Sequence, residues 1–136
     1  MKISTKGRYS LRLLLDLAEH RGQGFIALKD IARRQGISKK YLEQLVALLS
    51  HADILRANRG PHGGYMLAKT PEHYTAGQIL RITEGDLCPV ACLQDAPNQC
   101  ARSGCCKTLP VWEGLRAVID AYLDGITLQM MLDGKK

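Results

Sequence analysis

The feature that most constrains the fold is the stretch 37–67, in which an amphipathic segment runs directly into a glycine-rich turn. Ser38 is a favourable N-cap residue, and behind it apolar side chains recur at the i, i+3, i+4 and i+7 spacing of one helix face. These apolar residues are Leu42, Leu45, Val46 and Leu49. The pattern predicts a helix that starts after Ser38 and packs on one side.

Polar side chains occupy the first turns of this predicted helix, and their types can reach DNA phosphates or base edges. They are Lys39, Lys40, Tyr41, Glu43 and Gln44. A shorter amphipathic segment, 28–35, comes before the helix, and Gly36 suits the left-handed position that often ends a helix. Two helices joined by so tight a turn predict a helix-turn-helix whose second helix enters DNA by its N-terminal end.

The segment after this helix is typical of a β-hairpin with a basic tip. Runs at 54–57 and 65–67 flank the turn 58–64, where glycine and proline permit the reversal and Arg59 is left projecting. A helix-turn-helix followed by a hairpin predicts a winged helix, and the run 25–27 could add a short strand to it. A phosphate-binding glycine loop is disfavoured, because such a loop precedes a helix and a strand-like run follows here.

Basic residues are concentrated in the first half of the chain. Residues 1–70 hold 13 Lys and Arg against 5 Asp and Glu, a net charge of +8, whereas residues 71–136 have a net charge of −2. This asymmetry favours a polyanionic partner such as double-stranded DNA, although surface lysines that only maintain solubility would give the same total. Because no run has membrane-spanning length, we expect one DNA-binding domain plus an accessory element in a cytoplasmic protein without membrane contact.

A first helix is predicted up to about Glu19, capped by Ser4 or Thr5. Its expected apolar stripe consists of Leu11, Leu14, Leu15 and Ala18. Basic and aromatic side chains gather near its beginning, namely Lys6, Arg8, Tyr9 and Arg12. Positive charge opposes the helix macrodipole there, so we expect an external anion to compensate, and a DNA phosphate would do so. Lys6 and Tyr9 are therefore candidate DNA contacts, although ordinary solvated side chains would look the same.

The second half is predicted to contain further helices around a long loop. Thr75 begins a capping-box pattern for a helix that ends near Glu84, and residues 85–110 have the composition of a loop. After Pro110, apolar residues recur at alternating spacings of three and four, namely Trp112, Leu115, Ile119, Tyr122 and Ile126. So small a chain could hardly cover this seam alone, which favours a homodimer, although the seam could instead pack on the first helix.

We therefore expect a mainly α-helical chain with a small β wing and three regions. Residues 1–84 would form the winged helix-turn-helix DNA-binding region, and residues 85–110 a cysteine-bearing sensor loop. Residues 111–136 would form a long dimerisation helix and a C-terminal tail.

All five cysteines lie in the predicted loop, at Cys88, Cys92, Cys100, Cys105 and Cys106. A reducing compartment disfavours structural disulfides, so this clustering favours metal or redox chemistry. Thiolates in a flexible loop can bind an iron–sulphur cluster or zinc. An odd count leaves at least one cysteine outside any four-ligand set, and the adjacent Cys105 and Cys106 would fit poorly around one metal ion.

Four short motifs appear in order along the chain: KGRY at 6–9, YLEQL at 41–45, RGPHGGY at 59–65 and TAGQI at 75–79. Together they resemble the Rrf family of winged-helix transcriptional regulators, which includes iron–sulphur regulators, nitric-oxide sensors and cysteine-metabolism repressors. The resemblance runs from Met1 to about Leu132. It implies a homodimer with domain-swapped long helices that binds an operator through the second helix of the motif and the wing.

Carried onto this sequence, the resemblance implies roles for individual residues. Glu43 and Gln44 would read bases, and Arg59 would enter the adjacent minor groove. A carboxylate can accept a hydrogen bond from cytosine N4, and an arginine is attracted to a narrow, negative minor groove. The residues implied to lie near the major groove are Ser38, Lys39, Lys40 and Tyr41.

The resemblance also implies three cysteine ligands to iron, at Cys92, Cys100 and Cys106. The cluster could be of the 2Fe-2S or the 4Fe-4S type. Leu109 stands where the iron–sulphur regulators have a histidine, and Arg8 stands where the nitric-oxide sensors have an acidic residue. The fourth ligand is therefore left open between Cys88, Cys105, a histidine or carboxylate elsewhere, and no protein ligand at all.

These observations lead to one hypothesis and two alternatives. The hypothesis is a homodimeric repressor whose DNA binding responds to an iron–sulphur cluster in the loop. The first alternative is a cofactor-free, zinc-controlled or disulfide-controlled repressor that acts with an enzyme of sulphur metabolism. The second is a small electron-transfer or cluster-delivery protein, which would leave the basic winged helix without a use. An enzyme is disfavoured, because no nucleophile–base set, catalytic carboxylate pair or cofactor fingerprint is visible.

Overall fold

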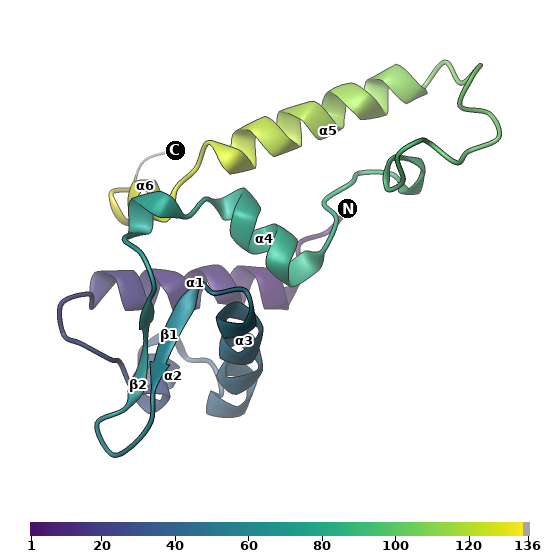
Figure 1. Cartoon of the computed structure of the whole chain (residues 1–136). Helices are drawn as coiled ribbons and strands as arrows, with labels where there is room; N and C mark the ends of the chain where they lie inside the picture. The colour runs from purple at the N-terminus through teal and green to yellow at the C-terminus, as the bar shows by residue number, and fades with distance from the viewer. Residues whose placement is uncertain (135–136) are drawn as a thin grey trace.

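The computed structural model describes residues 1–134 and shows a mainly helical chain with a two-stranded wing (Figure 1). The last two residues of the predicted C-terminal tail, 135 and 136, lie outside the described residues. The helices are α1 (Thr5–Glu19), α2 (Leu28–Gln35), α3 (Lys39–His51), α4 (Ala76–Glu84), α5 (Leu109–Asp124) and α6 (Leu128–Leu132). The strands are β1 (Leu55–Asn58) and β2 (Gly64–Leu67), and the short 3₁₀ turns are η1 (Pro71–His73) and η2 (Ala91–Leu93).

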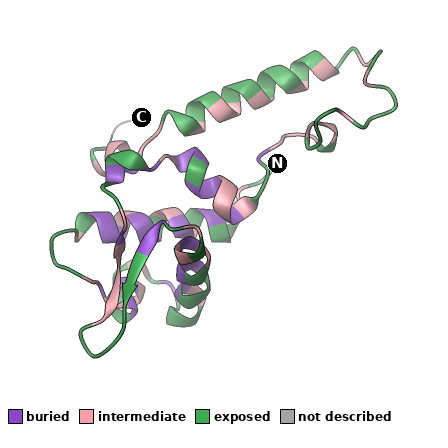
Figure 2. Ribbon diagram, viewed as in Figure 1, coloured by how far each residue is buried: buried purple, intermediate pink, exposed green. Residues whose placement is uncertain are grey.

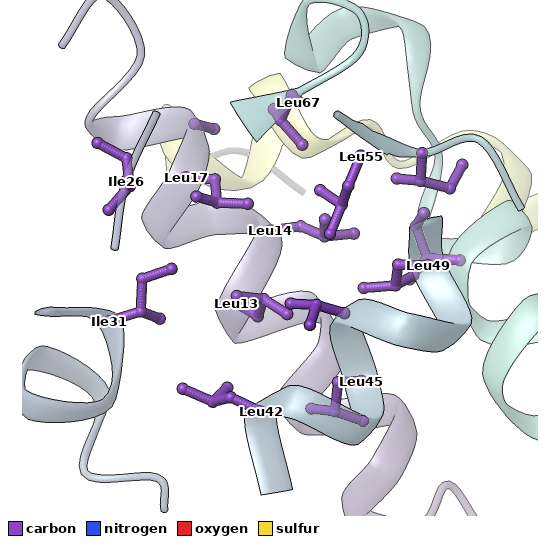
Figure 3. Packing of buried hydrophobic residues seen from close by; sticks show 14 of the residues in the cluster. Leu13, Leu14, Leu17, Ile26, Ile31, Leu42, Leu45, Leu49, Leu55 and Leu67 are labelled. Carbon is purple, nitrogen blue, oxygen red and sulfur yellow. The ribbon is translucent and has the colours of Figure 1, made fainter. Parts of the chain in front are cut away.

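Helix α1 lies at the centre of the fold. It packs against α2, α3 and the wing through one part of its surface and against α4 and α6 through another. Leu13, Leu14 and Leu17 are buried, and they meet the core residues of α3 and the wing (Figure 3). The predicted stripe was therefore partly wrong, because Leu11 and Leu15 are only partly buried. A single stripe describes a helix with one covered face, whereas α1 is covered from two directions.

The helix-turn-helix forms as predicted. Gly36 ends α2 in the left-handed region, with φ 65° and ψ 33°, and its N–H donates to the carbonyl of Ala32 at 2.9 Å. A side chain would strain this conformation, which explains the glycine. Ser38 then caps α3, because its Oγ accepts a hydrogen bond from the N–H of Tyr41 at 3.1 Å. These two local signals set the angle between α2 and α3.

The wing is an antiparallel pair in which Leu55 lies opposite Leu67 and Asn58 lies opposite Gly64. The strand predicted near residue 26 is a single bridge, formed by two hydrogen bonds of 2.8 Å between Ile26 and Tyr65. A side chain at position 64 would collide with the carbonyl of Ile26, so only glycine lets the two backbones approach this closely. The bridge holds the wing against the start of α2.

A buried ion pair joins α1 to the end of α2. The Asp16 side chain is 1% exposed and accepts hydrogen bonds from Arg34 at 2.6 and 3.0 Å and from Gln35 at 3.0 Å. Burial alone would raise the pKa of Asp16, but the hydrogen bonds from Arg34 and Gln35 outweigh it and hold this pKa below its usual value. Arg12, also on α1, donates to the Gln35 side chain at 3.2 Å. Polar contacts thus fix the turn that leads into α3.

The C-terminal elements return to the first half of the chain and end in the short helix α6. Thr75 caps α4 as predicted, with its Oγ1 accepting from the N–H of Gln78 at 3.1 Å. A bridge between Thr75 and Thr127 then brings α6 back, so that Leu128 is fully buried in the same core. Helix α5 packs mainly on α4, where Arg81 binds Asp120 at 2.8 Å and Asp124 at 2.6 Å. None of the helices within residues 1–134 is long and apolar enough to cross a membrane.

Helix α5 leaves an apolar stripe in solvent. None of its sixteen residues, all of which the structure describes, is buried (Figure 2). In the predicted seam, Trp112, Ile119 and Ile126 are partly buried, whereas Leu115 and Tyr122 are 41% and 59% exposed. Two further residues, Val111 and Val118, are 60% and 65% exposed. The open stripe therefore runs through Val111, Leu115, Val118 and Tyr122, at the 4, 3, 4 spacing of a coiled-coil seam.

We expect Asp16→Ala to lower the free energy of unfolding by about 3 kcal/mol at pH 7, because it leaves the partner charge of Arg34 without its carboxylate. Urea unfolding measures this loss. Asp30→Ala is the control, since the Asp30–Arg33 pair is exposed and contributes about 0.3 kcal/mol. Equal losses in the two variants would contradict the assignment.

The contribution of Asp16 should also depend on pH. A carboxyl whose folded pKa is lowered stabilises the fold above its unfolded pKa, and this contribution disappears as the pH falls through the folded pKa. The difference between wild type and Asp16→Ala should therefore narrow when urea unfolding is repeated well below the ordinary Asp pKa of 3.8. A difference that widens in acid would show that the charge of Asp16 does not stabilise the fold.

Candidate nucleic-acid interface and cysteine loop

The predicted DNA-contacting side chains of α3 form one open face. Its apolar stripe is buried in the core, which turns the opposite side of the helix to solvent. The exposed residues at its start are Ser38, Lys39, Lys40, Glu43 and Gln44, and Tyr41 is partly buried beside them. Within residues 1–134, neither Lys39 nor Lys40 pairs with a carboxylate, so both can bind phosphates without breaking an ion pair.

A groove separates α3 from the wing and brings two predicted contacts together. It has a volume of about 430 Å³, with Glu43 on the helix side and Arg59 on the wing side. Ala47, Ser50 and Asn58 also line it, and the sequence reasoning did not single them out. Ala47 and Ser50 follow Glu43 by four and seven residues, so helical spacing would have found them once Glu43 had been chosen. The groove lies between the second helix of the helix-turn-helix and the hairpin tip that carries Arg59.

The start of α1 touches the start of α3. The rings of Tyr9 and Tyr41 meet edge to face, with centroids 5.9 Å apart and planes at 88°. The guanidinium carbon of Arg12 lies 5.0 Å from the centre of the Tyr9 ring. Lys6 is exposed one turn earlier in α1. The structure therefore places Tyr9 against the start of α3, which its position in the sequence alone could not establish.

A carboxylate from within the chain lies at the start of α1, and the expected DNA phosphate there stays a prediction. Glu84, the last residue of α4, places its carboxylate against the backbone N–H groups of Ser4 and Gly7. Ser4 occupies the N-cap position, but its hydroxyl donates to Glu84 rather than capping the helix. Two N–H groups at this end are thus bound within the chain, and the Lys6 side chain in the first turn is exposed.

The cysteine loop joins α4 to α5 and extends away from the wing (Figure 1). It contains only the short turn η2 as regular structure and spans residues 85–108, so α5 begins slightly earlier than predicted. Cys100 and Cys105 are exposed, and the other three cysteines are partly buried. Across residues 1–134, no three His, Cys, Asp or Glu side chains form a group that could hold a metal ion. The structure therefore does not bring Cys92, Cys100 and Cys106 together.

Two of these thiols differ in acidity. Burial raises the pKa of Cys88 to about 11, assisted by a hydrogen-bonding interaction with Asp86. Its Sγ donates to the carbonyl of Leu93 at 3.2 Å. Hydrogen bonds from the Thr108 hydroxyl and from the backbone N–H groups of Thr108 and Leu109 lower the pKa of Cys106. Because the thiolate is the reactive and metal-binding form, Cys106 is better prepared than Cys88 for either chemistry.

Comparison with known proteins places the chain in one family over nearly its whole length. The Rrf2 model, described as an iron-dependent transcriptional regulator, matches residues 3–134. The HTH-type transcriptional regulator CymR of Bacillus subtilis (strain 168) is 40% identical over 129 residues, which cover 95% of this chain and 88% of that relative.

Solved structures of regulators with the same fold are similar as well. CymR, described as the global cysteine regulator of B. subtilis, superposes with a TM-score of 0.80 at 37% identity, covering 100% of this chain and 99% of that chain. IscR of T. potens gives a TM-score of 0.76 at 39% identity, covering 98% and 88%. Proteins named CymR and IscR are described as HTH-type transcriptional regulators. The chain therefore belongs to the Rrf2 family of helix-turn-helix transcriptional regulators, as its sequence motifs suggested.

Proposed function

We propose that this protein is a homodimeric regulator, acting as a repressor, that binds specific sites in double-stranded DNA. The observation that carries the proposal is the groove between α3 and the wing, which is lined by Glu43 and Arg59. The exposed start of α3 carries Lys39 and Lys40. Side chains that contact base edges then lie next to side chains that contact phosphates, and sequence-specific binding requires both. An electron-transfer or cluster-delivery protein would have no use for this groove.

The DNA-binding roles follow from the chemistry of each side chain. The carboxylate of Glu43 can accept from cytosine N4, and Gln44 can pair with adenine in the major groove. Arg59, at the tip of the wing, can enter the adjacent minor groove. Phosphate contacts would come from Lys6, Tyr9, Ser38, Lys39, Lys40 and Tyr41. These contacts position the protein, whereas Glu43, Gln44 and Arg59 provide the discrimination.

The exposed stripe of α5 supports the homodimer. The solvent-facing side of a helix is usually polar, whereas this side of α5 carries four apolar side chains at heptad spacing. In a two-fold dimer, the same four side chains of a second copy would cover them. A two-fold dimer presents two copies of α3 to DNA. We therefore expect an operator with two half-sites about 34 to 36 Å apart or a multiple of that distance.

We propose further that the cysteine loop binds an iron–sulphur cluster through Cys92, Cys100 and Cys106. The donor chemistry fits, because thiolates are the usual ligands of such clusters, and the family model is described as iron-dependent. Within residues 1–134 the three thiols are not gathered at one point, so the loop would have to close to bring them around a cluster. A bound cluster would supply a redox-sensitive link between parts of the loop. Cys88 or Cys105 remains a candidate for the fourth position.

A second candidate is control of the same DNA-binding module without a cluster. It is favoured by the 40% identity to CymR and by the acidity of Cys106, which suits disulfide exchange or zinc binding. In this case the signal would come from thiol chemistry or from a partner enzyme of sulphur metabolism. The two candidates share the operator-binding surface and differ only in what the loop senses.

Selection from random double-stranded DNA should recover a two-fold symmetric site. On that site we expect Glu43→Ala to relax discrimination at one base position by about 1–3 kcal/mol, because a single base contact is lost. Lys39→Ala should weaken binding to all sequences and reduce the salt slope by about one. Lys107→Ala, in the cysteine loop, is the matched control. Equal losses on every sequence from both variants would count against Glu43 as a reader.

We expect Val118→Glu to convert the dimer to a monomer, because it places a charge in the middle of the apolar stripe of α5. Sedimentation equilibrium distinguishes the two states. Ala117→Glu is the control, since Ala117 is exposed on a different face of the same helix. A wild type that is monomeric at all concentrations would remove the stripe from the proposed interface.

Anaerobic reconstitution should load the protein with iron and acid-labile sulphide and turn it brown. Replacing Cys92, Cys100 and Cys106 together with Ala should abolish the colour and both elements, because the proposed ligands are gone. Elemental analysis and absorption spectra provide the measurement, and His62→Ala, at the tip of the wing, serves as a control outside the loop. Zinc alone, or no metal, in the reconstituted wild type would favour the second candidate.

A further inference from the structure

Helix α1 begins without an anion of its own. Its N-cap residue Ser4 has an extended backbone, with φ −74° and ψ 171°, but provides no side-chain cap to the described first turn, and this turn contains no acidic residue. Lys6 and Arg8 add positive charge where unpaired N–H groups already give the helix its positive end. A stable start therefore needs an acceptor from elsewhere.

Glu84 supplies this acceptor through three hydrogen bonds to one oxygen. Its Oε1 accepts from the backbone N–H of Ser4 at 3.0 Å, from the backbone N–H of Gly7 at 3.0 Å and from the Ser4 hydroxyl at 2.6 Å. A Cβ at position 7 would collide with this oxygen, so glycine is what permits the approach. Charge-assisted bonds at a helix N-terminus are stronger than neutral ones. The end of α4 and the start of α1 are thus fixed to each other.

The same residue borders the cysteine loop. Within four residues of Glu84, the Cys88 thiol is bonded to the carbonyl of Leu93, and this carbonyl also accepts from Arg116 of α5 at 2.5 Å. The carboxylate of Asp86 accepts a hydrogen bond from the N–H of Cys88 at 3.1 Å and lies 3.8 Å from the guanidinium of Arg116. The first part of the loop is therefore held by hydrogen bonds of Cys88 and of Leu93, which follows Cys92 in the chain. Chemistry at these thiols would alter the segment that leads directly from Glu84.

At its other end, this contact reaches the DNA-binding surface. The turn of α1 that Glu84 holds carries Lys6 and leads to Tyr9, whose ring packs on Tyr41 at the start of α3. Chains of packed side chains and hydrogen bonds of this kind can couple two distant parts of a protein. A continuous path of contacts therefore runs from the cysteine loop through Glu84 and the first turn of α1 to Tyr9, which contacts the start of α3.

We propose that Glu84 is a positioning residue that couples the state of the cysteine loop to the DNA affinity of α1 and α3. This inference rests on the proposed function. When the loop keeps the arrangement seen here, Glu84 holds the start of α1 and its DNA contacts in place. When thiol chemistry rearranges the loop, the carboxylate withdraws, the first turn of α1 loosens, and the contacts of Lys6, Tyr9 and Tyr41 lose their geometry.

Operator affinity of the reduced, metal-free protein, before and after alkylation of its thiols with iodoacetamide, tests the coupling. We expect alkylation to weaken operator binding of the wild type by about tenfold, within the usual range of allosteric coupling. In Glu84→Ala this ratio should fall below about twofold, because the link is already broken. Glu84→Gln should largely retain the response, since its amide oxygen can accept the same bonds. Glu113→Ala, an exposed carboxylate on α5, is the matched control.

Gly7→Ala gives an independent way to break the same contact without changing any charge. The added methyl group displaces Glu84 Oε1, so this variant should also lose the alkylation response. The double variant Gly7→Ala/Glu84→Ala should behave like either single variant, because both remove one interaction. Amide hydrogen exchange should become faster in the first turn of α1 in both variants and stay unchanged in the core of α1, which separates loosening from unfolding.

A full alkylation response in Glu84→Ala would overturn the proposal, and so would a wild type whose operator affinity ignores alkylation. Loss of the response in Glu113→Ala would show that any carboxylate near the loop matters and would also overturn the specific role of Glu84. Failure of the proposed function has a different signature, since the untreated wild type would then bind every DNA fragment equally.

Discussion

The structure depends on the burial of α1 from two directions. Leu13, Leu14 and Leu17 belong to a core shared with α2, α3 and the wing, while α4 and α6 cover another part of the same helix. Each fully buried leucine contributes about 1.5–3 kcal/mol, so this shared helix accounts for much of the packing. It also means that α3 and α4, the helix that leads into the cysteine loop, are positioned against one common element. Neither can move far without affecting contacts along α1.

Much of this fold could be predicted because its signals are local. Gly36, Ser38 and Thr75 each satisfy or end a helix through atoms only a few residues away, so their residue types reveal their roles. The glycine-rich turn likewise identified the hairpin, and Gly64 has a specific reason in the close approach of the Ile26 carbonyl. The exposed start of α3 followed directly from the position of its apolar stripe.

The remaining features depend on contacts that no local pattern records. Ser4 and Glu84 are eighty positions apart, so no local pattern could show that a carboxylate of the same chain lies at the start of α1. The return of Leu128 to the core depends on a bridge between two segments that are distant in sequence. Periodicity identified α5 and two residues of its open stripe, Leu115 and Tyr122, but it selected the partly buried Trp112 and Ile119 in place of the exposed Val111 and Val118, because packing on α4 was unknown. The acidity of Cys88 and Cys106 depends on burial and on neighbours that spacing cannot predict.

As the proposed dimer interface, the open stripe of α5 would make operator binding depend on the concentration of the protein. In the proposed assembly, a single chain has one reading helix and makes only half of the phosphate contacts, so it binds the operator weakly. Where paired chains are scarce, operator occupancy rises roughly with the square of the chain concentration. Gene expression under such a regulator would change over a narrower range of protein levels than under one that acts as a single chain. Four apolar side chains on one helix would thus set a threshold for the switch.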